Sequence, residues 1–307
     1  MKVFITGGAG FIGSNVIRYF IDRNHEVVVL DNLSSGYLEN IPKSPKVRFI
    51  EGDIRDKEIL NKSMPGCDAV VHLAASVGNA RSIENPNLDS EINVIGTLNI
   101  LETARKNDIQ KVVYSSSAAI FGEPQQLPID ETHRFAPDTP YGVSKLAGEL
   151  QALSYAKLYG MDCVALRYFN VYGPNQRFDA YGNVIPIFAT LKLKRESLTV
   201  FGDGEQTRDF VHVADIAQAN YLGATQTKVT GAYNIGSGER ITLNQLTQLF
   251  NELEGVPTSP VVYAPPRKGD VRHSLANIEK AKTNLGFKPT KKIGDGLKEY
   301  WNWIISL

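Results

Sequence analysis

The sequence predicts an α/β fold in which a doubly wound parallel sheet is joined by a smaller, interleaved α/β lobe. Three observations support this prediction. Short, nearly continuous apolar runs alternate with helix-period segments along the first half of the 307-residue chain. A glycine-rich turn follows the first of these runs. After Arg167 the alternation loosens into longer loops, and no linker rich in Ser, Gly or Pro separates the two halves.

The predicted strands are short runs rich in β-branched residues, as expected for parallel strands covered by helices on both faces. They lie at 3–6, 26–30, 47–50, 69–74, 111–115 and 163–168, with a seventh at 233–236. The predicted helices lie at 11–23, 88–106, 141–159, 184–194, 213–224, 242–253 and 292–304. We expect the sheet domain to comprise 1–166 and about 208–236, and the lobe to comprise 167–207 and 237–307.

Composition and charge exclude several functional classes. Lys+Arg and Asp+Glu number 33 each, and a net charge near zero argues against a sequence-independent grip on nucleic acid. The sequence shows neither a signal-peptide pattern nor an apolar run of about eighteen residues, so we expect a cytoplasmic protein without a membrane span. Cys67 and Cys163 are expected to be buried free thiols, and the five histidines lack metal-ligand spacing, which predicts no metal site.

The first predicted strand leads into a glycine triplet that is typical of a dinucleotide site. Gly7, Gly10 and Gly13 allow a tight turn, a close approach of a pyrophosphate and close packing of the following helix. That helix presents free N–H groups to the phosphates. Asp31 ends the second strand, where a carboxylate binds a ribose diol and repels a 2′-phosphate. The sequence therefore predicts a Rossmann fold that binds NAD rather than NADP, with Asp53 placed to reach the adenine.

Tyr141 and Lys145 are the candidate reacting groups. They lie four residues apart on a helix that Pro140 can begin, so both side chains share one face. An ammonium beside a phenol, together with a cationic nicotinamide ring, favours the phenolate. Lowering a phenol pKa by about three units requires about 4 kcal/mol, which two positive charges in a partly dry cleft can supply. The pair therefore predicts a base placed beside the nicotinamide.

Taken together, these motifs resemble the extended short-chain dehydrogenase/reductases. The glycine triplet, "LAA" at 73–75, the serines at 115–117, "YGVSK" at 141–145 and "RYFNVYGP" at 167–174 follow the order of that family. The chain is most similar to its nucleotide-sugar epimerase/dehydratase branch, in particular to the UDP-glucose and UDP-N-acetylglucosamine 4-epimerases. The resemblance implies a UDP-sugar substrate, tightly held NAD, and a homodimer formed through a four-helix bundle.

The resemblance also implies roles for individual residues. Tyr141 would be the base, Lys145 would bind the nicotinamide ribose and lower the pKa of the tyrosine, and Ser117 would relay the proton of the sugar 4-hydroxyl. The further NAD contacts that it implies are Phe11, Ile12, Asn32, Ser35, Gly36, Ile54, Leu73, Ala74, Ala75, Asn93, Ser115 and Tyr168. The substrate contacts that it implies, besides Ser117 and Tyr141, are Val77, Asn170, Val184, Thr199, Val200, Phe201, Arg208, Arg267, Asp270 and Ser274.

Ala118 and Ala119 separate the predicted reaction from those of related enzymes. The 4,6-dehydratases that the chain resembles carry an Asp-Glu pair at these two places, and the decarboxylases carry a glutamate at the second. A methyl group neither accepts nor donates a proton. The resemblance therefore implies oxidation of the sugar at C4 by NAD, turnover of the 4-keto sugar and return of the same hydride to its other face. This is 4-epimerisation, which interconverts UDP-glucose and UDP-galactose.

The identity of the sugar and the type of reaction both stay open to some degree. Ser274 leaves room for a 2-acetamido group, so UDP-N-acetylglucosamine is a candidate beside UDP-glucose. Arg177 stands where uronate 4-epimerases carry an arginine for the sugar carboxylate, although those enzymes tend to have threonine in place of Asn170. The chain could also be an NAD-dependent keto-sugar reductase or a non-catalytic NAD-binding protein. The presence of both Tyr141 and Lys145 argues against a non-catalytic role.

Overall fold

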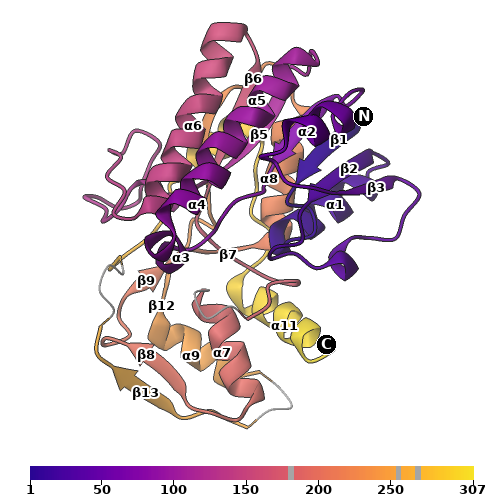
Figure 1. Ribbon diagram of the computed structural model, residues 1–307. Coiled ribbons are helices and arrows are strands. Elements are labelled where there is room, and N and C mark those ends of the chain that lie inside the picture. Colours follow the sequence, from indigo (N-terminus) through magenta and orange to yellow (C-terminus); the bar gives the residue numbers. More distant parts are fainter. Residues whose placement is uncertain (179–182, 254–256, 267–270) are drawn as a thin grey trace.

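A seven-stranded parallel sheet lies at the centre of the protein in the computed structural model, which describes residues 1–178, 183–253, 257–266 and 271–307 (Figure 1). Its strands are β1 (Lys2–Thr6), β2 (Glu26–Asp31), β3 (Val47–Glu51), β4 (Ala69–His72), β5 (Lys111–Ser117), β6 (Asp162–Tyr168) and β11 (Gly231–Ile235). They lie in the order β11-β6-β5-β4-β1-β2-β3, so the order reverses between β1 and β4. Ligands bind in the crevice at the carboxyl ends of strands beside such a reversal. The predicted fold class and all seven predicted strands are confirmed.

The sheet is apolar on both faces because alternate residues of each strand enter different cores. Val27 and Val29 of β2 pack under α1 (Phe11–Ile21) and α8 (Val213–Thr225), whereas Val28 and Leu30 join the core on the opposite face. That second face is covered by α2 (Lys57–Ser63), α5 (Thr97–Lys106) and α6 (Pro140–Tyr159). Burial of both faces explains why the strands are continuous apolar runs rather than alternating ones.

The predicted helix at 88–106 is present, but it has three parts. The α-helical turn α4 (Pro86–Ser90) leads into a π-helical turn at Glu91–Gly96, and α5 continues from Thr97. Such wide turns are rare and often occur at functional sites. A Cβ at Gly96 would overlap the side chain of Ile54, so glycine lets the turn approach the loop after β3.

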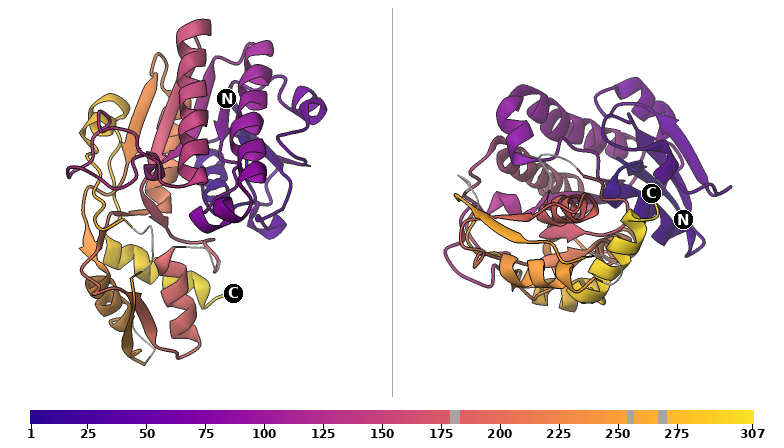
Figure 2. Two further views of the ribbon diagram at one scale, coloured as in Figure 1. Left: turned by 60° about the vertical axis from the view of Figure 1, so that its left-hand side comes forward. Right: turned by 90° about the horizontal axis from the view of Figure 1, so that it is seen from below.

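A second core lies beyond the carboxyl ends of the sheet strands. Its elements are α7 (Val184–Leu193), β8 (Leu198–Phe201), α9 (Leu243–Asn251), β13 (Val261–Ala264) and α11 (Ile293–Ile304). Phe188, Leu246, Phe250, Tyr300 and Trp301 fill this core. In Figures 1 and 2 the C-terminal helix α11 lies with this lobe and not against the sheet, although it is far from α7 along the chain.

Short elements connect the lobe to the sheet. Two of these are two-stranded ladders, which pair β7 (Asn170–Tyr172) with β10 (Phe210–His212) and β9 (Thr207–Arg208) with β12 (Ile241–Thr242), whereas a third ladder, β8 with β13, belongs to the lobe itself. Asp209 lies between β9 and β10, and its buried carboxylate accepts hydrogen bonds from the N–H groups of Ser237, Gly238 and Ala276 and from the Ser237 hydroxyl. One carboxylate thus ties together three segments that are distant in sequence.

Several short helices were not predicted from the sequence: α2, α3 (Asn79–Glu84), α10 (Glu279–Leu285) and the 3-10 turns Leu38–Asn40 and Ala118–Ile120. Each spans seven residues or fewer, which is too short for a helical period to show. Cys67 and Cys163 are free and buried, as expected. Within the described ranges, every helix is too short or too polar to cross a membrane.

Candidate active and dinucleotide-binding site

The glycine turn after β1 has no room for a side chain at Gly7 or at Gly13. Gly7 has a φ of +71°, and a Cβ there would lie 2.7 Å from the backbone nitrogen of Ala74. A Cβ at Gly13 would overlap the carbonyl oxygen of Gly7. The turn is therefore pressed against the loop that follows β4 on one side and against the start of α1 on the other.

Gly10 differs from these two glycines because the space beside it is open. A Cβ at Gly10 would meet only the Gly7 carbonyl oxygen, at 3.2 Å. Gly10 is also the N-cap of α1, and no side chain caps this helix start, whose first turn holds Phe11, Ile12 and Gly13. Open space before an uncapped helix N-terminus fits the pyrophosphate of a dinucleotide. The residues present therefore fit NAD.

Asp31 connects the glycine turn to the loop after β2. Its carboxylate is buried and accepts the N–H of Ala9 at 2.9 Å and the N–H of Leu33 at 2.8 Å. Burial raises the pKa of this carboxyl, and the two N–H donors oppose the increase. Asp31, the residue predicted to bind the ribose diol, thus lies beside the glycine turn, as that role requires.

The predicted adenine-side residues also come together. The Asn32 amide donates to Asp53 at 2.9 Å, and Arg55 forms an ion pair with Asp53 at 2.8 Å. The hydrogen bonds from Arg55 lower the pKa of Asp53 to about 2, so this carboxylate is charged at neutral pH. Gly36 contacts the glycine turn, because a Cβ there would lie 2.8 Å from Ala9.

The loop after β4 is held by two polar side chains. Thr6 accepts the N–H groups of Leu73 and Ala74 at 3.2 Å each. Asn93, from the π-helical turn, both accepts the N–H of Ser76 and donates to its carbonyl. The structure therefore brings Asn93 to the segment that contains Leu73, Ala74 and Ala75, and its direct contact with NAD stays a prediction.

The predicted catalytic side chains meet at the carboxyl end of β5. Helix α6 begins with Pro140 as its first residue, and the Thr139 hydroxyl caps it by accepting the N–H of Gly142. Tyr141 is in the first turn, and the Ser117 hydroxyl is close enough to its phenol to lower the phenol pKa. Lys145 is only 3% exposed, and its ammonium lies 4.8 Å from the centre of the Tyr114 ring.

The electrostatics of this pair differ from the prediction. Burial raises the pKa of Tyr141 to about 12, the nearby Ser117 hydroxyl lowers it in part, and the nearby Asp89 carboxylate raises it. Burial lowers the pKa of Lys145 to about 7, and Asp89 and Glu149 oppose the decrease. The groups of the protein thus push the pKa of Tyr141 upward, opposite to the direction predicted for the lysine and nicotinamide together. The reason is that burial penalises the phenolate and the ammonium alike.

Ala118 and Ala119 lie between Ser117 and the start of α6. The N–H of Ala119 donates to the Ser117 hydroxyl at 3.2 Å, and a Cβ at Gly142 would lie 2.6 Å from the Ala119 carbonyl oxygen. Both alanines are therefore close to the first turn of α6, yet neither carries a group that could transfer a proton.

Two further predicted cofactor residues lie on the strands beside this cluster. Ser115 of β5 and Tyr168 of β6 are both buried, and the Tyr168 hydroxyl donates to Asn220 at 2.9 Å. Burial raises the pKa of Tyr168, whose phenol also interacts with the Ser115 hydroxyl. The two residues thus lie near each other on paired strands of the sheet.

Some predicted substrate residues come together at the base of the lobe. Arg208 donates to the carbonyl of Thr207 at 2.9 Å, and the N–H of Ser274 donates to the same carbonyl at 3.1 Å. The Asn170 amide donates to the carbonyl of Asp209 at 3.2 Å. Arg208, Ser274 and Asn170 therefore lie around one short stretch of chain.

Other predicted substrate residues are more dispersed. Thr199, Val200 and Phe201 follow each other on β8, which pairs with β13, and Val184 begins α7. Val77 follows the loop held by Asn93 and is 53% exposed. Arg267 and Asp270 lie outside the described residues.

Arg177 has partners that do not favour a uronate substrate. Its guanidinium pairs with Glu39 at 2.8 Å and lies 3.9 Å from the centre of the Tyr37 ring. These contacts join the segment after β7 to the loop after β2. Asn175 joins the same segment to α1, because its amide donates to Ser14 at 2.9 Å.

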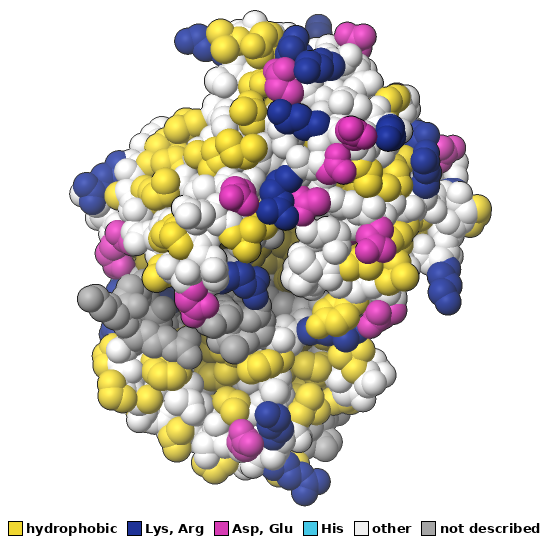
Figure 3. All heavy atoms as spheres, viewed as in Figure 1, with side chains coloured by type: hydrophobic (Ala, Val, Ile, Leu, Met, Phe, Trp, Pro, Cys, Tyr) yellow, Lys and Arg dark blue, Asp and Glu magenta, His cyan; other side chains and the backbone are white. Residues whose placement is uncertain are grey.

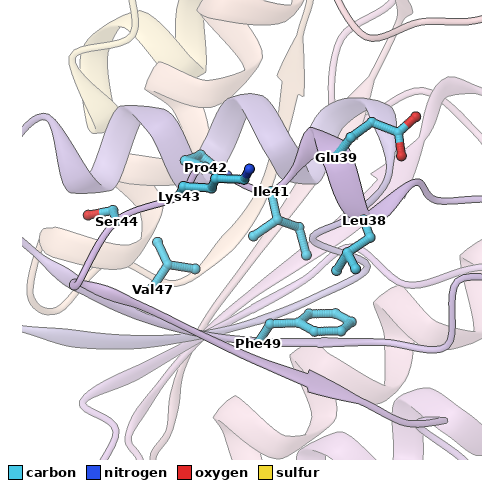
Figure 4. A pocket seen from close by; sticks show the side chains of 8 residues that line it. All are labelled: Leu38, Glu39, Ile41, Pro42, Lys43, Ser44, Val47 and Phe49. Atoms are coloured by element: carbon cyan, nitrogen blue, oxygen red, sulfur yellow. The ribbon is translucent and has the colours of Figure 1, made fainter.

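A shallow groove of about 250 Å³ lies nearby but contains none of the predicted site residues (Figure 4). Val47 and Phe49 of β3 face Leu38 and Ile41 across it. These side chains make the groove an apolar edge of the sheet, without a group suited to the predicted reaction.

Sequence reasoning missed three buried polar residues around the cluster. Asp89 and Ser144 both contact Asn93, and Glu149 forms a buried ion pair with Arg167 at 2.7 Å. The spacing of Asp89 and Asn93, four residues apart within a predicted helix, could have indicated that the two side chains share a face.

Comparison with known proteins places this geometry in a family. The model of the NAD dependent epimerase/dehydratase family matches residues 3–236. A putative UDP-glucose 4-epimerase of Methanocaldococcus jannaschii is 42% identical over 98% of each chain. The structure of a UDP-glucose 4-epimerase from Thermotoga maritima with UDP-glucose superposes with a TM-score of 0.94, at 39% identity over 100% of this chain and 99% of that one.

A third protein is related just as closely. A UDP-N-acetylglucosamine 4-epimerase from Methanobrevibacter ruminantium, solved with UDP-N-acetylmuramic acid, superposes with a TM-score of 0.95 at 38% identity. The superposition covers 99% of this chain and 98% of that one. The sequence match and the shared fold extend over nearly the whole chain, and the chain belongs to the NAD dependent epimerase/dehydratase family.

Proposed function

We propose that this protein is an NAD-dependent 4-epimerase that interconverts UDP-glucose and UDP-galactose. One observation carries the proposal: Ser117, Tyr141 and Lys145 come together at the carboxyl end of β5, on the same edge of the parallel sheet as the glycine turn after β1, and Ala118 and Ala119 occupy the places of the acid pair. The relatives named UDP-glucose 4-epimerase, and the Thermotoga maritima structure with UDP-glucose, support the choice of substrate.

NAD, held by Gly10, the first turn of α1 and Asp31, would supply the acceptor and later the donor of a hydride at sugar C4. Tyr141 removes the proton of the C4 hydroxyl, directly or through Ser117, and gives it back to the C4 oxygen after the keto sugar has turned. The Lys145 ammonium stabilises the phenolate that forms. Because the proton and the hydride both return, the protein ends each cycle in its starting state.

We further propose that the sheet domain, 1–166 with about 208–236, holds NAD and that the lobe holds the nucleotide of the substrate. The position of Arg208 near Asn170 supports this division, since a guanidinium and an amide both suit a diphosphate. Ser274, beside Arg208, would border the sugar and leave room for a 2-acetamido group. UDP-N-acetylglucosamine is therefore the second candidate substrate, and the Methanobrevibacter ruminantium epimerase favours it.

The test is to incubate the purified protein with UDP-glucose, UDP-N-acetylglucosamine or UDP-glucuronate and to follow the C4 configuration by NMR. We expect UDP-glucose to yield UDP-galactose, with deuterium placed at C4 retained in the product when free NAD is added in excess. Loss of the deuterium to the NAD pool would contradict an epimerase and support a keto-sugar reductase. If UDP-glucuronate were converted and the other two sugars were not, UDP-glucuronate would be the substrate in place of UDP-glucose.

We also propose that two copies of the chain form a homodimer through α5 and α6. Five apolar side chains on α6, on the α4 turn and on the π-helical turn that leads into α5 are between 43% and 69% exposed: Leu88, Ile95, Val143, Leu150 and Leu158. We call this set the α5/α6 face, and Figure 3 shows hydrophobic side chains gathered over this part of the molecule. On α6 they recur at intervals of seven and eight residues, which is a spacing suited to packing against another helix.

A further inference from the structure

The carboxyl group of Asp89 is buried next to the proposed active site. Asp89 is 1% exposed, and its Oδ1 atom accepts a hydrogen bond from the Asn93 amide at 3.1 Å. Its Oδ2 atom is buried and has no hydrogen-bond partner among the described residues. A carboxylate is almost never fully buried without a partner, so an unpaired oxygen at this position requires an explanation.

A short chain of hydrogen bonds links Asp89 to the first turn of α6. The Asn93 amide that donates to Asp89 also donates to the Ser144 hydroxyl at 3.0 Å. The Ser144 hydroxyl in turn donates to the backbone carbonyl of Tyr141 at 3.1 Å. Asp89 and Asn93, four residues apart across the π-helical turn, thus both face the helix that carries the proposed base.

The charged group closest in effect to Asp89 is Lys145. Burial raises the pKa of Asp89, whereas the Ser144 hydroxyl and then the Lys145 ammonium lower it. Asp89 in turn raises the pKa of Lys145, and its effect is larger than that of Glu149. Asp89 also acts on Tyr141 and on the buried Tyr114 of β5, raising the pKa of each phenol.

The other charged groups around this cluster are already paired or act elsewhere. Glu149, one turn beyond Lys145, is bound by Arg167 at 2.7 Å and by the Ser116 hydroxyl. His72 of β4 is neutral, since burial lowers its pKa to about 3. The charged residues of α3, Arg81 and Glu84, are not among the groups that shift the pKa of Asp89.

We propose that Asp89 is a positioning residue whose carboxylate keeps Lys145 in its ammonium form and, through Asn93 and Ser144, holds the first turn of α6 in place. Because one carboxylate oxygen accepts no hydrogen bond from the described residues, the negative charge is only partly compensated. This charge opposes the decrease in the pKa of Lys145. The inference rests on the proposed function for its kinetic test but not for its spectroscopic one.

The direct test is Asp89→Asn, which keeps the shape and the acceptor for Asn93 but removes the charge. A negative charge raises the pKa of every neighbouring group, so its removal lowers the pKa of both Tyr141 and Lys145. We therefore expect both limbs of the pH profile of kcat to move to lower pH, by roughly one unit. A residue with only a structural role would reduce kcat without moving the two limbs together.

A second measurement does not depend on turnover. In the NAD-loaded protein, the ultraviolet phenolate band of Tyr141 can be isolated as the difference between each protein and its Tyr141→Phe counterpart. We expect this band to appear at lower pH in Asp89→Asn than in the unmodified protein. If the unmodified protein showed no epimerase activity, the proposed function would fail while this titration still tested the role of Asp89.

Two further variants complete the experiment. Glu91→Gln removes the same charge two residues along, from a side chain that is 60% exposed, and should leave both limbs and the phenolate band unchanged. Asp89→Ser removes the charge with a smaller side chain, and it should shift the limbs as Asp89→Asn does if the asparagine variant fails to fold. Unchanged limbs in a folded Asp89 variant, or limbs that move in opposite directions, would overturn the proposal.

Discussion

Asn93 and Ser76 hold each other through two reciprocal hydrogen bonds. The N–H of Ser76 donates to the Asn93 side-chain oxygen at 2.8 Å, and the Asn93 amide donates to the Ser76 carbonyl at 2.9 Å. Asn93 is buried in the π-helical turn, and Ser76 follows the loop that contacts the glycine turn. This single side chain therefore replaces a backbone pairing between two segments that border the predicted NAD site.

Replacing Asn93 by alanine should weaken both the fold and the cofactor site. The substitution leaves the backbone groups of Ser76 without their partners, which we expect to lower the free energy of unfolding by about 2–4 kcal/mol. A looser 73–76 loop should also raise the Kd for NAD at least about ten-fold, which corresponds to about 1.4 kcal/mol. Urea unfolding and titration with NAD measure the two effects.

Asn107→Ala is the matched control for that variant. Asn107 lies at the other end of α5, and its side-chain amide donates to the Thr103 carbonyl at 2.8 Å. NAD affinity should be the same in this control as in the unmodified protein. Normal NAD affinity in Asn93→Ala, despite lower stability, would restrict Asn93 to a role in folding.

His72 makes the stability of the protein depend on pH. Its ring bridges the Thr6 and Thr97 hydroxyls at 2.7 Å and 3.0 Å. Burial, and then the charge of Lys145, lower its pKa from 6.5 to about 3, so the unfolded chain binds a proton that the folded protein excludes. As pH falls from about 6.5 toward 3, this group alone reduces the free energy of unfolding by about 1.4 kcal/mol per pH unit.

His72→Gln tests this linkage. The glutamine amide can still bond with one of the two threonines but does not titrate. Urea unfolding between pH 7 and pH 5 measures how the free energy of unfolding changes with pH. Other groups titrate in both proteins, but the variant should take up about one proton fewer on unfolding, so its free energy should fall less steeply as pH falls. If the free energy of unfolding changed with pH in the same way in both proteins, His72 would take up its proton in the folded state as well. The assignment of a buried neutral ring would then be wrong.

The large sheet could be predicted because burial on both faces leaves a direct signature in the sequence. Runs such as Val27–Leu30 and Ala69–Val71 contain only apolar residues, and few other structures require this over so few positions. The glycine turn was equally legible, since the close approaches at Gly7 and Gly13 exclude any side chain. Helices of ten residues or more could also be predicted, because they are long enough for a helical period to show in the sequence.

The electrostatics of the site could not be predicted in the same way. The sequence places Tyr141 and Lys145 one turn apart, but it does not show how deeply each group is buried. Burial decides the direction of both pKa shifts, and it depends on β5, β6 and α4, which pack against α6. Asp89 was overlooked because only the packing of α4 against α6 reveals that its carboxyl is enclosed.

A charge on the α5/α6 face should prevent dimerisation. Leu150 is 50% exposed at the middle of α6, and in the proposed dimer its side chain would be buried against the second copy. In Leu150→Glu we expect the dimer Kd to rise at least about 100-fold, because a carboxylate would have to be buried without a partner. Sedimentation velocity over a range of concentrations measures the change.

Leu193→Glu provides the control for surface charge. Leu193 is an exposed leucine at the end of α7 in the lobe, away from the α5/α6 face. The Leu193→Glu protein should sediment like the unmodified protein. If the Leu150→Glu protein remained dimeric, the interface would have to lie on another surface.

Ser274 should control access for substituted sugars. Its side chain is small and buried, and its N–H is fixed to the Thr207 carbonyl beside Arg208. In Ser274→Tyr the phenol would fill space that a 2-acetamido group needs. We expect kcat/KM for UDP-N-acetylglucosamine to fall at least about ten-fold more than kcat/KM for UDP-glucose, a difference of about 1.4 kcal/mol in transition-state binding.

Ser274→Ala is the companion variant, and it should retain both activities because it adds no volume. Thermal unfolding of both variants checks that the tyrosine is accommodated. Equal losses on the two substrates in a folded Ser274→Tyr protein would show that this position does not select the sugar.

Tyr141→Phe removes one oxygen atom and should nearly abolish turnover. Without the phenol, the Ser117 hydroxyl loses the base to which it would pass the C4 proton. General acid–base catalysis typically contributes 10² to 10⁴ in rate, so we expect kcat to fall about 1,000-fold. NAD should bind as before, since the ring and the helix start stay in place. Near-normal kcat would assign the base to another group.

The partnership of Tyr141 with Ser117 makes a sharper test than either variant alone. If the serine acts by relaying the proton to the phenol, Ser117→Ala should reduce kcat about 100-fold in the unmodified protein but have little further effect in Tyr141→Phe. Residues that act as one unit are non-additive in this way, whereas independent contributions would multiply. Multiplying losses in the double variant, measured with UDP-glucose at saturating concentration, would therefore separate Ser117 from the proton transfer and leave it a role in binding the sugar.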